Sequence, residues 1–206
     1  MVSITQEWIP AGRINRPGKT NPMQYITIHE TGNTAAGADA RAHASYLRNV
    51  NAKVSWHYTV DSRAIYQHLP DNESAFHAGD GADGPGNARS IGIEICVNAD
   101  GDFDKAVRNA AQLCRKLMAE HGIALKNIRQ HNAWNGKDCP YHLRRSGWNA
   151  FLTLCAAAPD AIPSAWAKAS WEKAVARGIT DGLRPQAACT REELVTMLDR
   201  AGVLEG

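Results

Sequence analysis

The sequence predicts an α/β protein in which helices flank a mixed central β-sheet and a small C-terminal helical hairpin follows. Short segments rich in β-branched and aromatic residues alternate with longer segments of helical periodicity between residues 24 and 157. Two of the short segments, at 55–60 and 64–69, are close enough to form a hairpin. A stretch with two prolines then precedes two amphipathic helical segments. These features predict a domain over 1–157, a linker over 158–164 and a helical segment over 165–206.

The predicted strands are bounded by turn-forming residues. Residues 1–23 contain three prolines and are predicted as an extended arm or loop. The strands are expected at 24–29, 55–60, 64–69, 90–96 and 127–130. The isoleucine-rich strand at 90–96 is expected to be central and buried on both sides. The glycine-rich segment 80–87 lacks the Lys-Ser/Thr ending of a phosphate loop and is interpreted as a turn-forming rim.

Three helices are predicted between and after these strands. In the first, at 38–50, one face is expected to carry Ala42, Tyr46, Leu47 and Val50. The clearest helix spans 104–121, has apolar residues three or four apart, and ends at Gly122. A last helix of this domain is expected at 148–157. Beyond the linker, helices are expected at 166–177 and 191–201, a pair too small to bury a good core alone.

Composition excludes several classes of function. The chain has 206 residues and a formal net charge of +2, with no run of Lys and Arg, so nucleic-acid binding is not expected. No stretch approaches the ~18 consecutive apolar residues of a membrane span, and residues 1–10 lack the pattern of a secretory signal. We therefore expect synthesis in a cytoplasm without membrane insertion. The five cysteines are odd in number and irregularly spaced, which indicates reduced thiols.

The strongest local pattern is a histidine and a cysteine, His131 and Cys139, eight residues apart on an irregular loop. Imidazole and thiolate are zinc ligands, and a catalytic zinc uses three protein ligands and leaves one position open. His29, at the end of a predicted strand, is the expected third ligand. Spacing alone leaves this open, because a lone histidine or cysteine is more often structural. The histidines at 43, 68, 121 and 142 are interpreted as structural or solvent-facing.

Glu94 is the one acidic residue within an apolar strand. Burial would raise the pKa of its carboxyl group, which suits a general base. The alternative, which the sequence leaves open, is that Glu94 faces solvent from an edge strand.

Five segments together resemble the phage lysozyme-type N-acetylmuramoyl-L-alanine amidases, relatives of the peptidoglycan recognition proteins. The matching segments, in the order found in the family, are 25–31, 54–58, 75–79, 87–94 and 131–140. The resemblance implies zinc ligation by His29, His131 and Cys139. It also implies that Glu94 takes a proton from water and that Lys137 stabilises the oxyanion. The implied reaction cleaves the amide between N-acetylmuramic acid and L-alanine in peptidoglycan.

The resemblance also predicts groove residues that meet glycan or peptide: Asn33, Trp56, His57 and His77. His57 and His77 are alternatively expected to fix the tautomer of a ligand histidine. Glu30 departs from the family, where asparagine or histidine is common, and is expected to alter the rim of the site.

Residues 166–202 resemble one surface-layer homology motif, a module that binds secondary wall polymers. Such motifs usually pack in threes, so wall binding, a homo-oligomer and a C-terminal brace all remain open. Two rivals to the amidase are a non-catalytic peptidoglycan-binding module and a cysteine peptidase using Cys139 and His131. With no secretory signal, an endolysin released through a membrane pore is expected, and a cellular autolysin or recycling amidase is the alternative.

Overall fold

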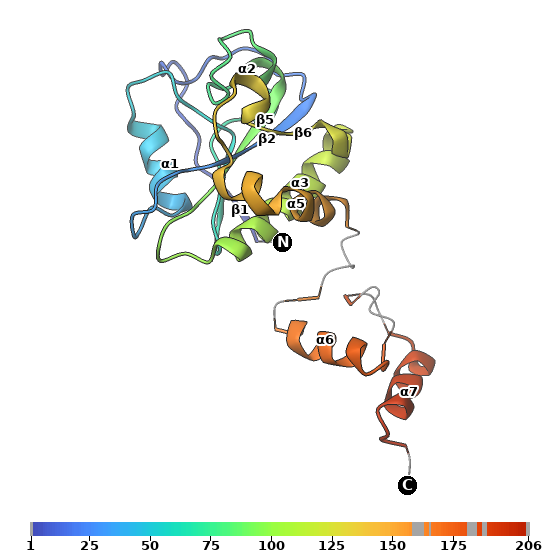
Figure 1. The fold of residues 1–206 in the computed structure, drawn as a ribbon. Coiled ribbons are helices and arrows are strands. Elements are labelled where there is room, and N and C mark those ends of the chain that lie inside the picture. Colours follow the sequence, from blue (N-terminus) through green and yellow to red (C-terminus); the bar gives the residue numbers. More distant parts are fainter. Residues whose placement is uncertain (1, 158–162, 165, 181–184, 187–188, 205–206) are drawn as a thin grey trace. The chain divides into compact units, whose positions relative to one another are not determined.

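The structure, a computed structural model, describes residues 2–157, 163–164, 166–180, 185–186 and 189–204. The chain forms two compact units, Met1–Ala156 and Ala157–Gly206 (Figure 1). Of the predicted linker, residues 158–162 lie outside the described residues.

A six-stranded sheet forms the centre of the first unit, in the order β1-β4-β3-β5-β2-β6. Its strands are β1 (Ile4–Gln6), β2 (Tyr25–Glu30), β3 (Tyr58–Val60), β4 (Ile65–Gln67), β5 (Ser90–Ile95) and β6 (Ile128–Gln130). Strands β3 and β4 form the predicted antiparallel hairpin, and every other pairing in the sheet is parallel. The predicted mixed α/β fold is confirmed, and β5 is an interior strand as expected.

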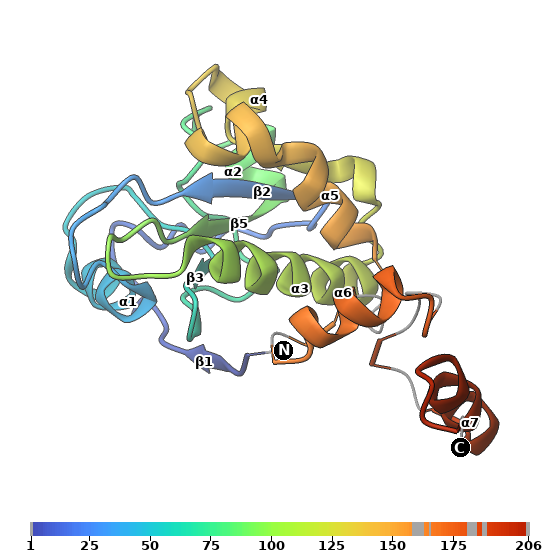
Figure 2. The same cartoon turned by 60° about the horizontal axis from the view of Figure 1, so that its bottom comes forward.

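Helices cover both faces of this sheet. The helices of this unit are α1 (Ala40–Asn49), α2 (Pro85–Arg89), α3 (Phe103–His121), α4 (Asn132–Asn135) and α5 (Trp148–Ala156), with a short 3₁₀ helix η1 (Leu125–Asn127) and a short π-helix η2 (Leu143–Gly147). Helix α3 packs against β3, β5 and α5, and Figure 2 shows it alongside the sheet. Helix α1 packs against β3 and β4.

Alternation along β2 and β5 divides the sheet into an apolar and a polar face. The isoleucines at 26, 28, 91, 93 and 95 are fully buried in one cluster with residues of α3 and α5. Each such side chain contributes about 1.5–3 kcal/mol by leaving water. The intervening residues, which include Thr27, His29, Gly92 and Glu94, point to the other face. The expected two-sided burial of β5 is therefore an apolar core on one side and a polar site on the other.

Capping residues set the ends of the main helices. Asp102 accepts a hydrogen bond from the backbone N–H of Lys105 and starts α3. Gly122 ends it in the left-handed conformation, with φ 67°, and donates its N–H to the carbonyl of Met118. Asp39 starts α1 in the same way as Asp102 starts α3.

Two predictions about local structure were wrong. Within the arm at 1–23, Ile4–Gln6 forms β1, because its backbone pairs in parallel with β4. Helix α1 buries Ala40, His43, Ala44 and Leu47, whereas Ala42 and Tyr46 are exposed, because the position of the sheet decides which face is covered.

The glycine-rich segment is not purely a loop. The carboxylate of Asp80 accepts hydrogen bonds from the backbone N–H groups of Gly86 and Asn87. These bonds satisfy the first turn of α2, which begins at Pro85, a residue suited to the start of a helix.

The second unit contains α6 (Lys168–Ala176) and α7 (Arg191–Arg200). The hydroxyl of Thr190 accepts from the N–H of Glu193, and the Glu193 carboxylate accepts from the N–H of Thr190, so the predicted capping box is present. Residues 181–184 and 187–188, part of the surface-layer-like segment, lie outside the described residues.

The sequence analysis predicted reduced cysteines and no membrane-spanning segment. In the described residues all five cysteines are free thiols; four are buried and Cys189 is exposed. No helix within the described ranges combines the length and the apolar character needed to cross a bilayer.

Candidate metal centre and active site

The three expected metal ligands meet at the carboxyl ends of the parallel strands, where open α/β sheets form their clefts. His29 is the fifth residue of β2, and His131 follows β6 directly. Cys139 lies on the turn after α4, where its carbonyl accepts from the N–H of Asn132. Residues that are distant in sequence thus converge because β2 and β6 are neighbours in the sheet.

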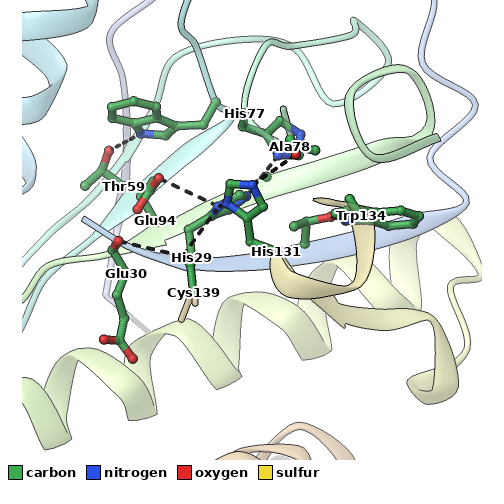
Figure 3. Close-up of polar contacts among 12 residues, drawn as sticks. His29, Glu30, Thr59, His77, Ala78, Glu94, His131, Trp134 and Cys139 are labelled. Atoms are coloured by element: carbon green, nitrogen blue, oxygen red, sulfur yellow. Dashed lines mark hydrogen bonds and ion pairs between the residues drawn. The ribbon is translucent and has the colours of Figure 1, made fainter. Parts of the chain in front are cut away.

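The ligand atoms are close and buried (Figure 3). The Nδ1 atoms of His29 and His131 are 2.9 Å apart, and the Cys139 Sγ lies 4.0 Å from His29 Nδ1. All three atoms lie within 4.8 Å of one another. Sequence reasoning singled out these residues, and the structure brings them together.

The surroundings of the two rings fit a metal. His131 Nε2 lies 3.0 Å from the carbonyl of Ala78, which can only accept, so this nitrogen carries the proton. His131 Nδ1 therefore presents a lone pair towards His29 Nδ1. Burial, the largest cause, and the nearby charge of Lys137 lower the pKa of both histidines, which keeps the rings neutral. Neutral imidazole is the form that binds a cation, and two imidazoles with one sulfur suit Zn²⁺.

Cys139 is a thiol in this environment. Burial and the neighbouring Glu94 raise its pKa to about 12. A bound cation would favour the thiolate, since ligation and deprotonation are coupled.

Glu94 lies beside the cluster. Its Oε1 is 3.9 Å from His29 Nδ1, and its side chain is 14% exposed. Its Oε2 is buried and has no hydrogen-bond partner among the described residues. Burial raises the pKa of the carboxyl group to about 8, although the charge of Lys137 opposes this rise. The alternative of a solvent-facing Glu94 on an edge strand does not hold, because β5 is interior.

An open pocket of about 350 Å³ adjoins Glu94. Its lining residues are Thr31, Asn33, Ala38, Ala42, His43, Tyr46, Val54, Trp56 and Glu94. The rings of Tyr46 and Trp56 stack with centroids 6.4 Å apart, and the Trp56 indole donates to the hydroxyl of Thr59. An apolar wall with a few polar groups suits an organic ligand.

The four expected groove residues separate into two pairs. Asn33 and Trp56 line this pocket, whereas His57 and His77 are buried and are not part of its lining. The ring of His57 contacts the backbone carbonyl of Glu73 and the N–H of Gly92. His77 instead contacts the metal cluster, because its Nδ1 lies 2.9 Å from His29 Nε2. The position of His77 corresponds to the alternative expectation, a partner that sets a ligand's tautomer.

Lys137 is exposed on the turn between α4 and Cys139. Its positive charge lowers the pKa of His29, His131 and Glu94. The ammonium group therefore favours the neutral histidines and the ionised carboxylate at this site.

Glu30 does not alter the rim as expected, because alternation along β2 turns its side chain away from His29. Its two carboxylate oxygens accept from the backbone N–H groups of His142 and Leu143, and the ring of His142 lies 2.7 Å from Oε2. Glu30 therefore holds the segment that follows Cys139.

Sequence reasoning missed Asn87 as a supporting residue. Its Oδ1 accepts from the N–H groups of both His77 and Ala78, each at 2.7 Å. These two residues supply the outer contacts of His29 and His131. The only signal was its place within the matching segment 87–94.

The comparisons with known proteins agree with this geometry. Two relatives from Bacillus subtilis (strain 168) are named N-acetylmuramoyl-L-alanine amidases: CwlH, 54% identical over 152 residues, and XlyA, 57% identical over 151 residues. The matches cover 74% and 73% of this chain. The chain spans 60% of the length of CwlH and 50% of that of XlyA.

Two solved structures are also similar. The catalytic domain of XlyA and a mutant endolysin from Bacillus subtilis each show 55% identity and a TM-score of 0.73. The matches cover 75% and 76% of this chain and 100% of each of those chains. The first unit thus has the fold of a cell-wall amidase catalytic domain. The chain belongs to the N-acetylmuramoyl-L-alanine amidase family, whose sequence profile matches residues 19–142.

Proposed function

We propose that this protein hydrolyses the amide between N-acetylmuramic acid and L-alanine in peptidoglycan, with Zn²⁺ held by His29, His131 and Cys139. The observation that carries the proposal is the convergence of these three ligand atoms beside the unpaired carboxylate of Glu94. The names of CwlH and XlyA support the choice of bond and substrate.

Each residue has a distinct role in the proposed reaction. When bound, Zn²⁺ supplies a Lewis acid that lowers the pKa of water towards ~7 and polarises a carbonyl. Glu94 orients the attacking water, takes its proton and returns a proton to the leaving amine of L-alanine. Burial raises the pKa of the Glu94 carboxyl group, so the carboxylate takes up a proton more readily than an exposed glutamate would. Lys137 faces the charge that develops on the lactyl carbonyl oxygen.

The pocket beside Glu94 orients the substrate in the proposed reaction. Asn33 offers hydrogen bonds, and Trp56 with Tyr46 offers an apolar wall for the group next to the scissile bond. Positioning of this kind lowers the barrier by fixing the reacting atoms in advance.

Digestion of purified cell walls tests this function. Mass spectrometry should find stem peptides with a free L-alanine amine and glycan with a free lactyl carboxyl group, a gain of one water per cut. A chelator should stop the digestion, and added zinc should restore it. Cleavage at a glycosidic bond or within the stem peptide would reject the assignment.

The same experiment separates the two rival functions. A non-catalytic binding module would be retained on walls without releasing products. A cysteine peptidase would lose activity on thiol alkylation and keep it in the presence of chelator. The raised pKa of Cys139 favours the amidase, because a nucleophilic cysteine needs an accessible thiolate.

The lytic role is part of the proposal. We infer that the protein acts as a phage or prophage endolysin on the wall of its host, which the similarity to a Bacillus subtilis endolysin supports. Wall lysis by the purified protein added from outside, measured as loss of turbidity, tests this role.

For the second unit we propose wall-polymer binding or self-association. The supporting observation is that α7 exposes Leu194 and Val195, at 52% and 54%. Light scattering on the full chain and on a Leu194→Asp, Val195→Asp variant distinguishes the two. A larger mass that falls to the monomer in the variant indicates self-association. Identical monomer masses exclude it, and wall pull-down then tests polymer binding.

A further inference from the structure

Helix α1 forms one wall of the pocket beside Glu94. Three of its residues, Ala42, His43 and Tyr46, line that pocket. The first turn of α1 is tied to the hairpin of β3 and β4, because the N–H of Ala40 donates to Asp61 Oδ2 at 2.9 Å. The position of α1 therefore fixes one side of the space that the substrate would enter.

The last turn of α1 is held from another part of the chain, the segment 9–18. The final carbonyl groups of a helix have no partner within the helix. Asn15 Nδ2 donates to the carbonyl of Leu47 at 2.8 Å, and Arg13 Nη2 donates to the carbonyl of Val50 at 2.9 Å. The positive charge of Arg13 also suits the negative end of the helix dipole.

Both side chains accept an energetic cost in this position. Asn15 is fully buried, and its Oδ1 has no hydrogen-bond partner among the described residues. The Nε of Arg13 is likewise buried without a partner in the described ranges. A buried polar atom without a hydrogen bond lowers stability. The bonds to Leu47 and Val50 are therefore the contacts that these two side chains make at the end of α1.

The segment 9–18 is itself fixed to the rest of the unit. Arg16 donates through Nε and Nη2 to both carboxylate oxygens of Glu73, each at 2.8 Å. Ile9 and Leu47 are both fully buried in one small cluster that also contains Trp56. The segment therefore has anchors of its own, and Asn15 and Arg13 connect these anchors to the end of α1.

We propose that Asn15 and Arg13 are positioning residues for substrate binding. They hold the turn of α1 that carries Tyr46, whose ring stacks on Trp56 across the pocket wall. Neither residue lines the pocket, so both act through α1. The segment 9–18 also lies outside residues 19–142, which the family profile matches.

This inference deepens the proposed function and rests on it for the identity of the substrate. The position of α1 can be tested without any substrate.

Hydrogen exchange of the full chain, measured by mass spectrometry, tests whether the segment holds α1. In the double variant Arg13→Met, Asn15→Leu, amides at 44–52 should exchange about tenfold faster, because two hydrogen bonds to the last turn are lost. Amides of α3 should keep their rates. Asn21→Leu is the matched control. Asn21 is also a buried asparagine before β2, but it donates to the carbonyls of Asp71 and Ser90. This control should leave exchange at 44–52 unchanged.

Kinetics on a soluble N-acetylmuramoyl peptide test whether this position matters for binding. The double variant should raise KM about 3–10-fold, the effect of losing one or two hydrogen bonds, and should keep kcat and zinc content. Arg13→Lys keeps a donor for the Val50 carbonyl and should have a lower KM than Arg13→Met. Asn21→Leu should keep the KM of the unaltered chain. Thermal melting establishes that each variant is folded at the assay temperature.

Unchanged exchange at 44–52 in the folded double variant would overturn the proposal, as would an unchanged KM. An equal rise of KM in Asn21→Leu would also overturn it, because general loosening would then explain the effect. If the double variant does not fold, Arg13→Met alone provides both measurements. Absence of cleavage by the unaltered chain would refute the proposed function instead, and the exchange result would still decide whether the segment positions α1.

Discussion

Glu94 and His29 are register partners on the parallel strands β5 and β2, and Glu94 Oε1 lies 3.9 Å from His29 Nδ1. Register partners on adjacent strands point to the same face of a sheet. The acid expected to move protons is therefore held beside the expected metal ligand by backbone hydrogen bonds. Such positioning on rigid elements keeps catalytic geometry within narrow limits.

Replacing this acid should separate catalysis from metal binding. In Glu94→Gln we expect wall hydrolysis to fall about 10²–10⁴-fold, because the amide cannot take a proton. Zinc content by elemental analysis should stay at one ion per chain. Turbidity loss at the wild-type rate would remove Glu94 from the mechanism.

The same variant should stabilise the metal-free fold at neutral pH. Folding raises the pKa of Glu94 from an ordinary 4.5 to about 8. The unfolded chain therefore ionises more readily, and Glu94 costs stability as pH rises from 4.5 to 8. We expect Glu94→Gln to gain on the order of 1–3 kcal/mol at pH 8 and nothing at pH 4. Urea unfolding at both pH values measures this, and a gain of equal size at pH 4 contradicts it.

Zinc binding should release a proton from Cys139. The thiol is protonated at pH 7, since its pKa is about 12, and ligation requires the thiolate. Calorimetry in two buffers of different ionisation enthalpy counts the protons released. Cys139→Ser should bind zinc more weakly and release about one proton fewer. Unchanged metal affinity in this variant would refute the ligand role.

Lys137 should act on the transition state and leave the metal in place. We expect Lys137→Ala to lower kcat about 10²–10³-fold, with zinc content retained. Lys137→Arg keeps the positive charge and should recover part of the rate. Equal rates for the alanine variant and the wild type would exclude oxyanion stabilisation by this residue.

Glu30 should stabilise the segment after Cys139. Glu30→Gln loses the charge that three donors from residues 142 and 143 share, at a cost of about 1–3 kcal/mol of unfolding free energy. Asp138→Asn is the matched control on the same segment. Its carboxylate is 51% exposed in pairs with Arg144 and Arg145, where solvent screens the charges, so this variant should lose much less stability than Glu30→Gln. Equal losses in urea unfolding would show that burial of Glu30 is unimportant.

The sequence by itself determined the fold class, the long helix α3 with its Gly122 stop, the capping box at Thr190 and the family. These depend on local periodicity, capping residues and the spacing of motifs, which can be recognised in the sequence alone. It also singled out His29, His131 and Cys139, although spacing alone left their roles open.

Only the tertiary structure decided which side chains support these residues. Strand order and register are set by contacts between residues far apart in the sequence. A shift of the register by one residue moves every side chain of the strand to the opposite face of the sheet. This is why Glu30 points away from the site, Glu94 points into it, and His77, unlike His57, contacts His29. The proton on a histidine nitrogen likewise depends on the partner of the other nitrogen. Those partners here, His77 and Ala78, come from one loop that lies 48 to 53 residues away in the sequence.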